Sequence, residues 1–227
     1  EERSEHAVPD EFGCEAVVTV IADLVTDLGG GVPVGVGFPT VIQHGAVRSP
    51  APSHQVVEWM DYELGSVLIK RLGQPVAVLN DGDAAGLSEM QFGAGKGQSG
   101  VVMVFTLGTG IGSALFIDGV IVPNLELGRL YLAAEPLVAE YQAAARVRTD
   151  EQLSWPEWSD RMQRYFSHIE RVFSPELIIV GGGVSNEHEK WLPDLELRAQ
   201  IVPADMRNNA GIVGAALAAA GLGPAIS

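Results

Sequence analysis

Leu-Asn-Asp-Gly-Asp-Ala-Ala-Gly, residues 79–86, begins with the last residue of the apolar run 75–79. The run is short and rich in valine, which predicts a buried β-strand, and the apolar spacing over 84–92 predicts a helix. In open α/β folds, ligands bind outside the carboxyl ends of the strands. The stretch therefore predicts an α/β protein with a site at Asp81, whose carboxylate could accept a proton from a substrate hydroxyl.

The same arrangement occurs twice more along the chain. The apolar run 101–105 leads into Thr-Leu-Gly-Thr-Gly-Ile-Gly at 106–112, and the run 177–180 leads into three glycines at 181–183. Glycine lets backbone N–H groups approach phosphate oxygens closely, and a threonine hydroxyl adds a further donor. We therefore predict a phosphate-binding turn formed by Gly108, Thr109, Gly110 and Gly112, and a second donor-binding turn formed by Gly181, Gly182 and Gly183.

Each of these segments also has a purely structural interpretation. Asp81 or Asp83 could cap the helix that follows, because a carboxylate accepts hydrogen bonds from the first N–H groups of a helix. The glycines at 108–112 could form a tight turn, and those at 181–183 could simply reverse the chain. The occurrence of all three segments in one chain favours a single binding site.

The rest of the chain fits an α/β fold. We expect helices over 16–25 and 64–72, a strand over 34–38, partial helix over 131–153, and a hairpin at Asp118-Gly119. Ser154 and Glu157 have capping-box spacing. An apolar helical stripe follows them and is interpreted as core: Trp158, Met162, Tyr165, Phe166, Ile169, Val172 and Phe173.

Composition excludes several classes of protein. The net charge is −15, which disfavours attraction to nucleic acid or to an anionic membrane surface. Apolar residues make up 47% of the chain, but no apolar run has the length of a membrane span, and the charged first residues do not resemble a secretory signal. A single cysteine, Cys14, excludes an internal disulfide and a cysteine-cluster zinc site, and no histidine spacing indicates a metal site. We expect a cytoplasmic protein.

Several short motifs, in this order, resemble the ROK family of sugar kinases, and within it the branch that uses polyphosphate to phosphorylate glucose. The likeness covers most of the chain from Val34 onwards. It is carried by residues 79–86, 107–112, Pro-Asn-Leu-Glu-Leu-Gly at 123–128, Tyr-Phe-Ser-His-Ile-Glu at 165–170, Phe-Ser-Pro-Glu-Leu-Ile-Ile-Val-Gly-Gly-Gly-Val-Ser at 173–185, and Arg-Asn-Asn-Ala-Gly-Ile-Val-Gly-Ala-Ala at 207–216.

The resemblance implies a two-lobed actin/hexokinase-like (ribonuclease H-like) ATPase fold with the ligand cleft between the lobes. A small lobe is expected over 1–97 and a large lobe over 98–227, with the last helix, 208–220, packing back on the small lobe. The glycine-rich segment 93–100 is the expected hinge. The family's Asp-x-Gly-x-Thr strands do not occur in the sequence, and we expect them upstream of it. A homodimer is a further family expectation.

The resemblance also implies a reaction, the transfer of a phosphoryl group from inorganic polyphosphate, ATP or both to the 6-hydroxyl of glucose, with Mg²⁺ accompanying the donor. Asp81 is then the general base, Gly108, Thr109 and Gly110 hold the transferred group, and no metal site is made by the chain's own residues. The expected sugar-binding residues are Asn80, Glu126 and Glu140.

Two departures from the family pattern bear on substrate choice. Arg129 stands where the family has a sugar-contacting histidine, and arginine is only a donor, so it could bind a substrate oxygen or a phosphate. The segment 48–53 stands where the family has a stretch with a sugar-binding asparagine. An ATP-only kinase for hexoses or amino sugars and a non-catalytic sugar sensor are the alternatives. Sugar-responsive repressors of the family carry an extra N-terminal helix-turn-helix, and neither such a domain nor a basic recognition helix is found in the sequence.

Overall fold

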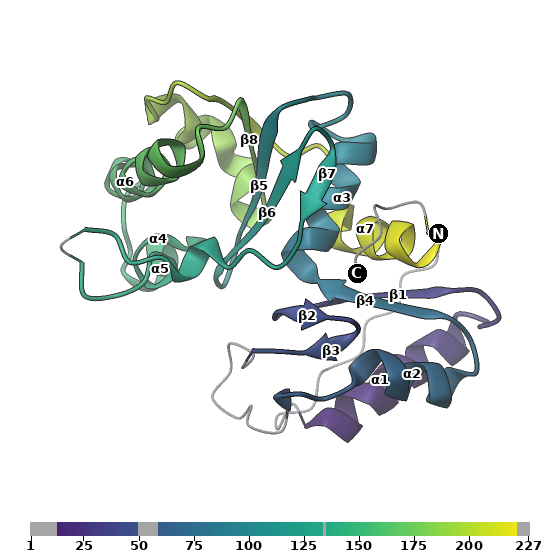
Figure 1. Cartoon of the computed structure of the whole chain (residues 1–227). Coiled ribbons are helices and arrows are strands. Elements are labelled where there is room, and N and C mark those ends of the chain that lie inside the picture. The colour runs from purple at the N-terminus through teal and green to yellow at the C-terminus, as the bar shows by residue number, and fades with distance from the viewer. Residues whose placement is uncertain (1–12, 50–58, 134, 222–227) are drawn as a thin grey trace.

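The computed structural model describes residues 13–49, 59–133 and 135–221, and within these ranges the strands form three sheets (Figure 1). The largest sheet has five strands in the order β7-β6-β5-β8-β9, and the pairs β1-β4 and β2-β3 form the other two. The strands are β1 Val34–Phe38, β2 Ile42–Gln43, β3 Ala46–Val47, β4 Val76–Asn80, β5 Val101–Leu107, β6 Ile111–Ile117, β7 Val120–Val122, β8 Leu177–Gly181 and β9 Gln200–Pro203.

The five-stranded sheet is mixed. β8 runs parallel to both β5 and β9, whereas β5, β6 and β7 form an antiparallel meander. The predicted hairpin is confirmed, because Ile117 pairs with Val120 across a two-residue turn. Asp118 and Gly119 have φ values of 51° and 79°, as a type I′ turn requires.

The α-helices agree with the predicted positions to within a few residues. They are α1 Cys14–Asp27, α2 Leu64–Leu72, α3 Asp81–Phe92, α4 Glu140–Ala143, α5 Ala145–Asp150, α6 Trp155–Phe173 and α7 Ala210–Ala219. The capping box between Ser154 and Glu157 is formed at the start of α6. The prediction that Val172 belongs to the core is wrong. Val172 is 58% exposed, because it does not lie on the buried face of α6.

β5 separates two hydrophobic cores, because successive side chains of a strand point to opposite faces. Met103 and Phe105 pack with α6 on one face, and Val102 and Val104 pack with α3 and α7 on the other. A third core joins α1 and α2 to the β1-β4 sheet. Figure 1 shows α3 and α7 between the two groups of strands, so the start of α3 lies near both.

α7 packs closely because two glycines remove side chains at its contacts. A Cβ placed on Gly214 would lie 1.6 Å from the Ala84 carbonyl oxygen of α3, and one placed on Gly35 of β1 would lie 1.9 Å from that of Ala215. The last helix therefore packs on β1 as well as on α3. The division into lobes 1–97 and 98–227 stays a prediction. Across residues 13–49, 59–133 and 135–221, no helix has the length and apolar character needed to cross a membrane.

Candidate active site

The predicted site residues lie where strands end. β5 and β8 are parallel neighbours, with Thr106 paired to Gly181, so both strands deliver their following turns to the same edge of the sheet. β1 and β4 are also parallel, and Phe38 pairs with Asn80 at their carboxyl ends. α3 begins directly after β4 and packs on β6. Each pairing brings two distant segments together, and the packing of α3 on β6 connects the two sheets.

Asp81 is the first residue of α3, and it is not the cap of that helix. The cap is Asn80, whose Oδ1 accepts hydrogen bonds from the N–H groups of Gly82 at 2.8 Å and Asp83 at 3.1 Å. Asp81 Oδ1 also accepts from Gly82 at 2.8 Å. Asn80 is therefore the N-cap, Asp81 adds a second acceptor for one N–H of the first turn, and Asp81 is exposed to solvent.

The surroundings of Asp81 change its acidity. Solvent reaches the side chain, but protein atoms surround it on most sides, and this partial burial raises the pKa of the carboxyl group. Backbone hydrogen bonds from Gly82 and from Asp81 itself oppose the change. A raised pKa brings a carboxylate closer to the range in which general bases work well.

Gly82 allows α3 to approach β6, and Gly112 of β6 leaves room for the Thr106 side chain of β5. A Cβ placed on Gly82 would lie 3.0 Å from the backbone nitrogen of Ser113, and one placed on Gly112 would lie 2.4 Å from Thr106 Oγ1 and 3.7 Å from the Gly82 Cα. Gly112 lies within β6, paired with Thr106. A side chain at this position would collide with Thr106, and the phosphate contact of Gly112 stays a prediction.

The predicted phosphate-binding turn is the hairpin between β5 and β6. Leu107 pairs with Ile111, so Gly108, Thr109 and Gly110 form the loop, closed by a hydrogen bond from the N–H of Gly108 to the Gly110 carbonyl at 3.1 Å. Gly108 and Thr109 are exposed. The turn is therefore open to solvent, and its binding of phosphate stays a prediction.

The second glycine turn lies directly beside the first. Gly182 has a φ of 86°, and a Cβ there would lie 2.2 Å from the carbonyl oxygen of Leu107. Gly181 is buried at the end of β8, whereas Gly183 is exposed. Gly182 is thus needed for packing, and Gly183 is the open position of the predicted donor turn.

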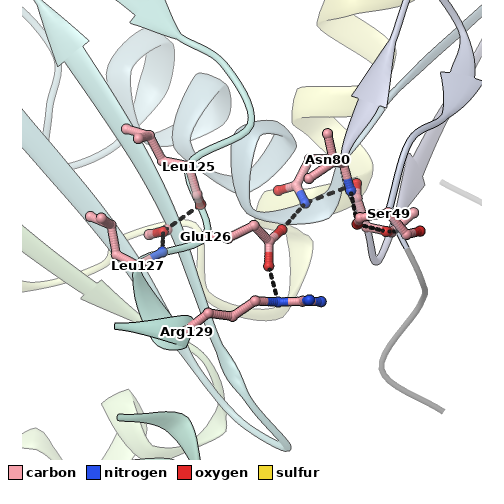
Figure 2. Close-up of polar contacts among 9 residues, drawn as sticks. Ser49, Asn80, Leu125, Glu126, Leu127 and Arg129 are labelled. Carbon is pink, nitrogen blue, oxygen red and sulfur yellow. Dashed lines mark hydrogen bonds and ion pairs between the residues drawn. The ribbon is translucent and has the colours of Figure 1, made fainter. Parts of the chain in front are cut away.

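Asn80 and Glu126 come together, as predicted for a shared sugar site (Figure 2). The Asn80 amide donates to the Thr40 carbonyl at 3.1 Å and lies 3.5 Å from Glu126 Oε1, which is a weak hydrogen bond. Ser113 Oγ donates to the Leu125 carbonyl and accepts from the Leu127 N–H, so it holds the loop that carries Glu126.

Arg129 reaches the same carboxylate. Its Nε donates to Glu126 Oε2 at 3.0 Å, and both side chains are partly exposed. Burial raises the pKa of Glu126, Arg129 lowers it, and the negative charges of Asp81 and Glu140 raise it. Arg129 is therefore part of the predicted sugar site.

Glu140 lies at the start of α4, beside the phosphate turn. A Cβ placed on Gly110 would lie 2.8 Å from Glu140 Oε2. Its negative charge also adds, as the smallest of the causes, to the raised pKa of Glu126. The structure thus places Glu140 beside Gly110, and its contact with sugar stays a prediction.

Sequence reasoning missed several polar residues around the site. Thr40 is fully buried, its hydroxyl bonds to Ser49, and its carbonyl accepts from the Asn80 amide, so Thr40 links Ser49 to Asn80. Thr40 lies two residues after β1, so a search of every strand end would have found it. Segment 48–53, which differs from the family pattern, contacts Thr40 through Ser49. Its residues 50–53 lie outside the described residues.

Among the described ranges, no group of three or more His, Cys, Asp or Glu side chains is arranged to hold a metal ion. Magnesium usually keeps several water ligands and is held by one or two carboxylates together with substrate phosphates. The carboxylates beside the glycine turn fit an ion that arrives with the phosphoryl donor.

Comparison with known proteins identifies relatives over most of the chain. Residues 1–124 match the ROK family. A polyphosphate glucokinase of Mycobacterium tuberculosis is 42% identical over 204 residues, which cover 89% of this chain and 76% of the relative.

Solved structures agree with this assignment. The inorganic polyphosphate/ATP-glucomannokinase of Arthrobacter sp. strain KM is 48% identical, with a TM-score of 0.91 over 98% of this chain and 89% of that one. A ROK family glucokinase from Streptomyces griseus, solved with glucose and AMPPNP, shares the fold at 23% identity, with a TM-score of 0.76 over 95% of this chain and 90% of that one. The actin/hexokinase-like fold is therefore confirmed, and the chain belongs to the ROK family.

Proposed function

We propose that this protein is a glucokinase that transfers a phosphoryl group from inorganic polyphosphate, and also from ATP, to the 6-hydroxyl of glucose. The observation that carries the proposal is the position of Asp81, which is exposed at the start of α3, a helix that packs on β5 and β6, the two strands joined by the 108–110 turn. The polyphosphate glucokinase and the polyphosphate/ATP-glucomannokinase described above support the choice of donors.

The proposed sugar site uses the groups around Asn80. Asn80 and Glu126 bind glucose hydroxyls, with Arg129 orienting the Glu126 carboxylate through its hydrogen bond. Glu140 completes the sugar site next to Gly110. Asp81 accepts the proton of the 6-hydroxyl as its oxygen attacks phosphorus, and the raised pKa of this carboxyl group suits the role of general base.

The proposed donor site uses the two glycine turns. Backbone N–H groups of Gly108, Thr109 and Gly110 hold the transferred phosphoryl group, and the turn at 181–183 holds the rest of the donor. Mg²⁺ bound with the donor would neutralise part of the phosphate charge. Gly112, which follows the turn and lies within β6, is the remaining phosphate contact of the proposal.

The direct test is to incubate the protein with glucose and either polyphosphate or ATP, and to identify glucose 6-phosphate by NMR. Product from both donors is expected, and competition between them should show one shared site. Turnover with ATP alone would favour an ATP-only kinase for hexoses or amino sugars. Glucose binding without turnover would favour the sugar sensor.

Mannose is the most informative second substrate. The Arthrobacter relative is named as a glucomannokinase, and Arg129 replaces the family histidine beside the sugar. Measuring kcat/KM for glucose and mannose in the same assay would define the preference. A homodimer and a cytoplasmic location also remain predictions, and sedimentation velocity would test the first.

A further inference from the structure

Asn124 joins two segments that lie 82 residues apart in the sequence. Its side-chain Oδ1 accepts a hydrogen bond from the N–H of Ile42 at 2.8 Å, and its Nδ2 donates to the Ile42 carbonyl at 2.8 Å. Both polar atoms of the amide therefore bind the backbone of one residue of β2. The contact ties the loop after β7 to the β2-β3 hairpin.

The backbone N–H of Asn124 bonds to a residue of α3. Its N–H donates to Asp83 Oδ2 at 2.8 Å, and Asp83 is only 1% exposed, within the first turn of α3. Asn124 has a φ of 64°, a left-handed conformation that asparagine and glycine adopt more readily than most residues. The sequence at this position thus suits both the backbone conformation and the amide contact.

These bonds connect the segments that carry the proposed sugar site. Asp83 lies two residues after Asp81, Asn124 lies two residues before Glu126, and Ile42 lies two residues after Thr40. The Thr40 carbonyl accepts from Asn80, which in turn approaches Glu126. The hydrogen bonds of Asn124 to Ile42 and to Asp83 therefore join the same three segments that carry the proposed sugar site.

We infer that Asn124 and Asp83 are positioning residues for glucose, which fix the spacing of the β2-β3 hairpin, the start of α3 and the loop bearing Glu126. The inference rests on the proposed function, since glucose is the ligand whose site these segments line. Asn124 acts through Glu126 and Thr40, because its own amide atoms are already bonded to Ile42.

The test is the substitution Asn124→Gly, with glucose affinity measured by calorimetry and KM for glucose and donor measured by turnover. Glycine keeps the left-handed backbone and the N–H that binds Asp83, but it lacks both bonds to Ile42. Gln152→Gly is the matched control, because Gln152 is also left-handed, with a φ of 54°, and is exposed.

Asn124→Gly should weaken glucose binding by about tenfold, while KM for the donor stays within about twofold of the parent. Gln152→Gly should leave both values at the parental level. Glucose affinity within about twofold of the parent for Asn124→Gly would overturn the inference, as would an equal loss of affinity for sugar and donor.

Asp83 gives a second, independent comparison in case Asn124→Gly does not fold. Asp83→Asn keeps a side-chain oxygen that can accept from the Asn124 N–H, whereas Asp83→Ala removes it. Glucose affinity should be lost in Asp83→Ala and largely kept in Asp83→Asn. Equal affinity in the two variants would contradict the inference.

The binding and turnover measurements separate this inference from the proposed function. A parent that binds glucose but makes no product would contradict the kinase proposal. The ratio of glucose affinities between the parent and Asn124→Gly would still decide the role of Asn124. A parent that binds no glucose would overturn both.

Discussion

Arg129 donates a hydrogen bond from Nε to Oε2 of Glu126 at 3.0 Å. Burial raises the pKa of Glu126, the charges of Asp81 and Glu140 add to the rise, and the Arg129 guanidinium opposes it by stabilising the ionised carboxylate. The arginine that replaces the family histidine therefore favours the charged form of Glu126, a proposed sugar-binding residue.

Arg129→Met should move the acidic limb of the pH profile of kcat/KM for glucose to higher pH. Without the cation the pKa of Glu126 rises further, so a higher pH is needed to ionise the carboxylate that binds sugar. Arg129→Lys retains the charge and should shift the limb less. An acidic limb unchanged in Arg129→Met would show that Glu126 ionisation does not control glucose use.

Asp83→Asn should stabilise the protein at neutral and alkaline pH. Burial raises the pKa of Asp83 to about 7, with Asp81 and Glu126 adding to the effect and the Asn124 N–H opposing it. The unfolded carboxyl has a pKa of about 3.9, so the folded state binds more protons between roughly pH 4 and pH 7, and stability falls as pH rises through that window.

The free energy of unfolding of Asp83→Asn should therefore exceed that of the parent above pH 7, by at most about 4 kcal/mol, and the difference should shrink towards pH 4. Denaturant titrations at several pH values measure it. The exposed Asp160 provides the control variant Asp160→Asn. A difference that does not depend on pH would refute the assignment of a raised pKa to Asp83.

Gly182→Ala and Gly183→Ala separate packing from donor binding. Alanine at Gly182 would meet the Leu107 carbonyl and a φ of 86°, which should cost about 1–3 kcal/mol of stability. Among the described residues, no atom lies within 4 Å of a Cβ on Gly183. Gly183→Ala should keep the parental stability and raise KM for the donor, so an unchanged donor KM would place the donor elsewhere.

Gly214→Ala and Gly211→Ala form a matched pair on α7. A methyl group at Gly214 would collide with the Ala84 carbonyl of α3, and overpacking of this kind costs about 1–3 kcal/mol or more. At Gly211 a Cβ finds no described atom within 4 Å, so alanine should stabilise the helix by up to about 1 kcal/mol. Equal melting temperatures for both variants would contradict the close packing of α7 on α3.

Much of the fold could be predicted because its elements carry strong local patterns. The strand Val34–Phe38 and the helix Leu64–Leu72 were predicted with the bounds that the structure has, and Asp118-Gly119 gave its hairpin through turn chemistry. β9 and the β2-β3 hairpin were missed. β2 and β3 have two residues each, and β9 ends in Pro203, so neither presents the alternation that identifies a strand.

The site was predicted in part for a related reason. Asn80, Asp81 and the glycine turns follow apolar runs that predict strands, so they could be identified as strand-end residues from local sequence. The positioning roles inferred for Asn124 and Asp83 depend on contacts with distant residues, which no local pattern contains. Sequence also could not show that Asn80 would take the capping role that had been considered for Asp81 or Asp83.

The most direct test of the account is the turnover number of Asp81→Asn with saturating glucose and polyphosphate, beside calorimetric glucose binding by the same variant. The asparagine keeps the shape and an oxygen for the Gly82 N–H, but it cannot accept the proton of the sugar hydroxyl. We predict that kcat falls by about 10²–10⁴-fold while glucose affinity stays near the parental value. A variant that retains more than about a tenth of the parental kcat would show that Asp81 is not the base.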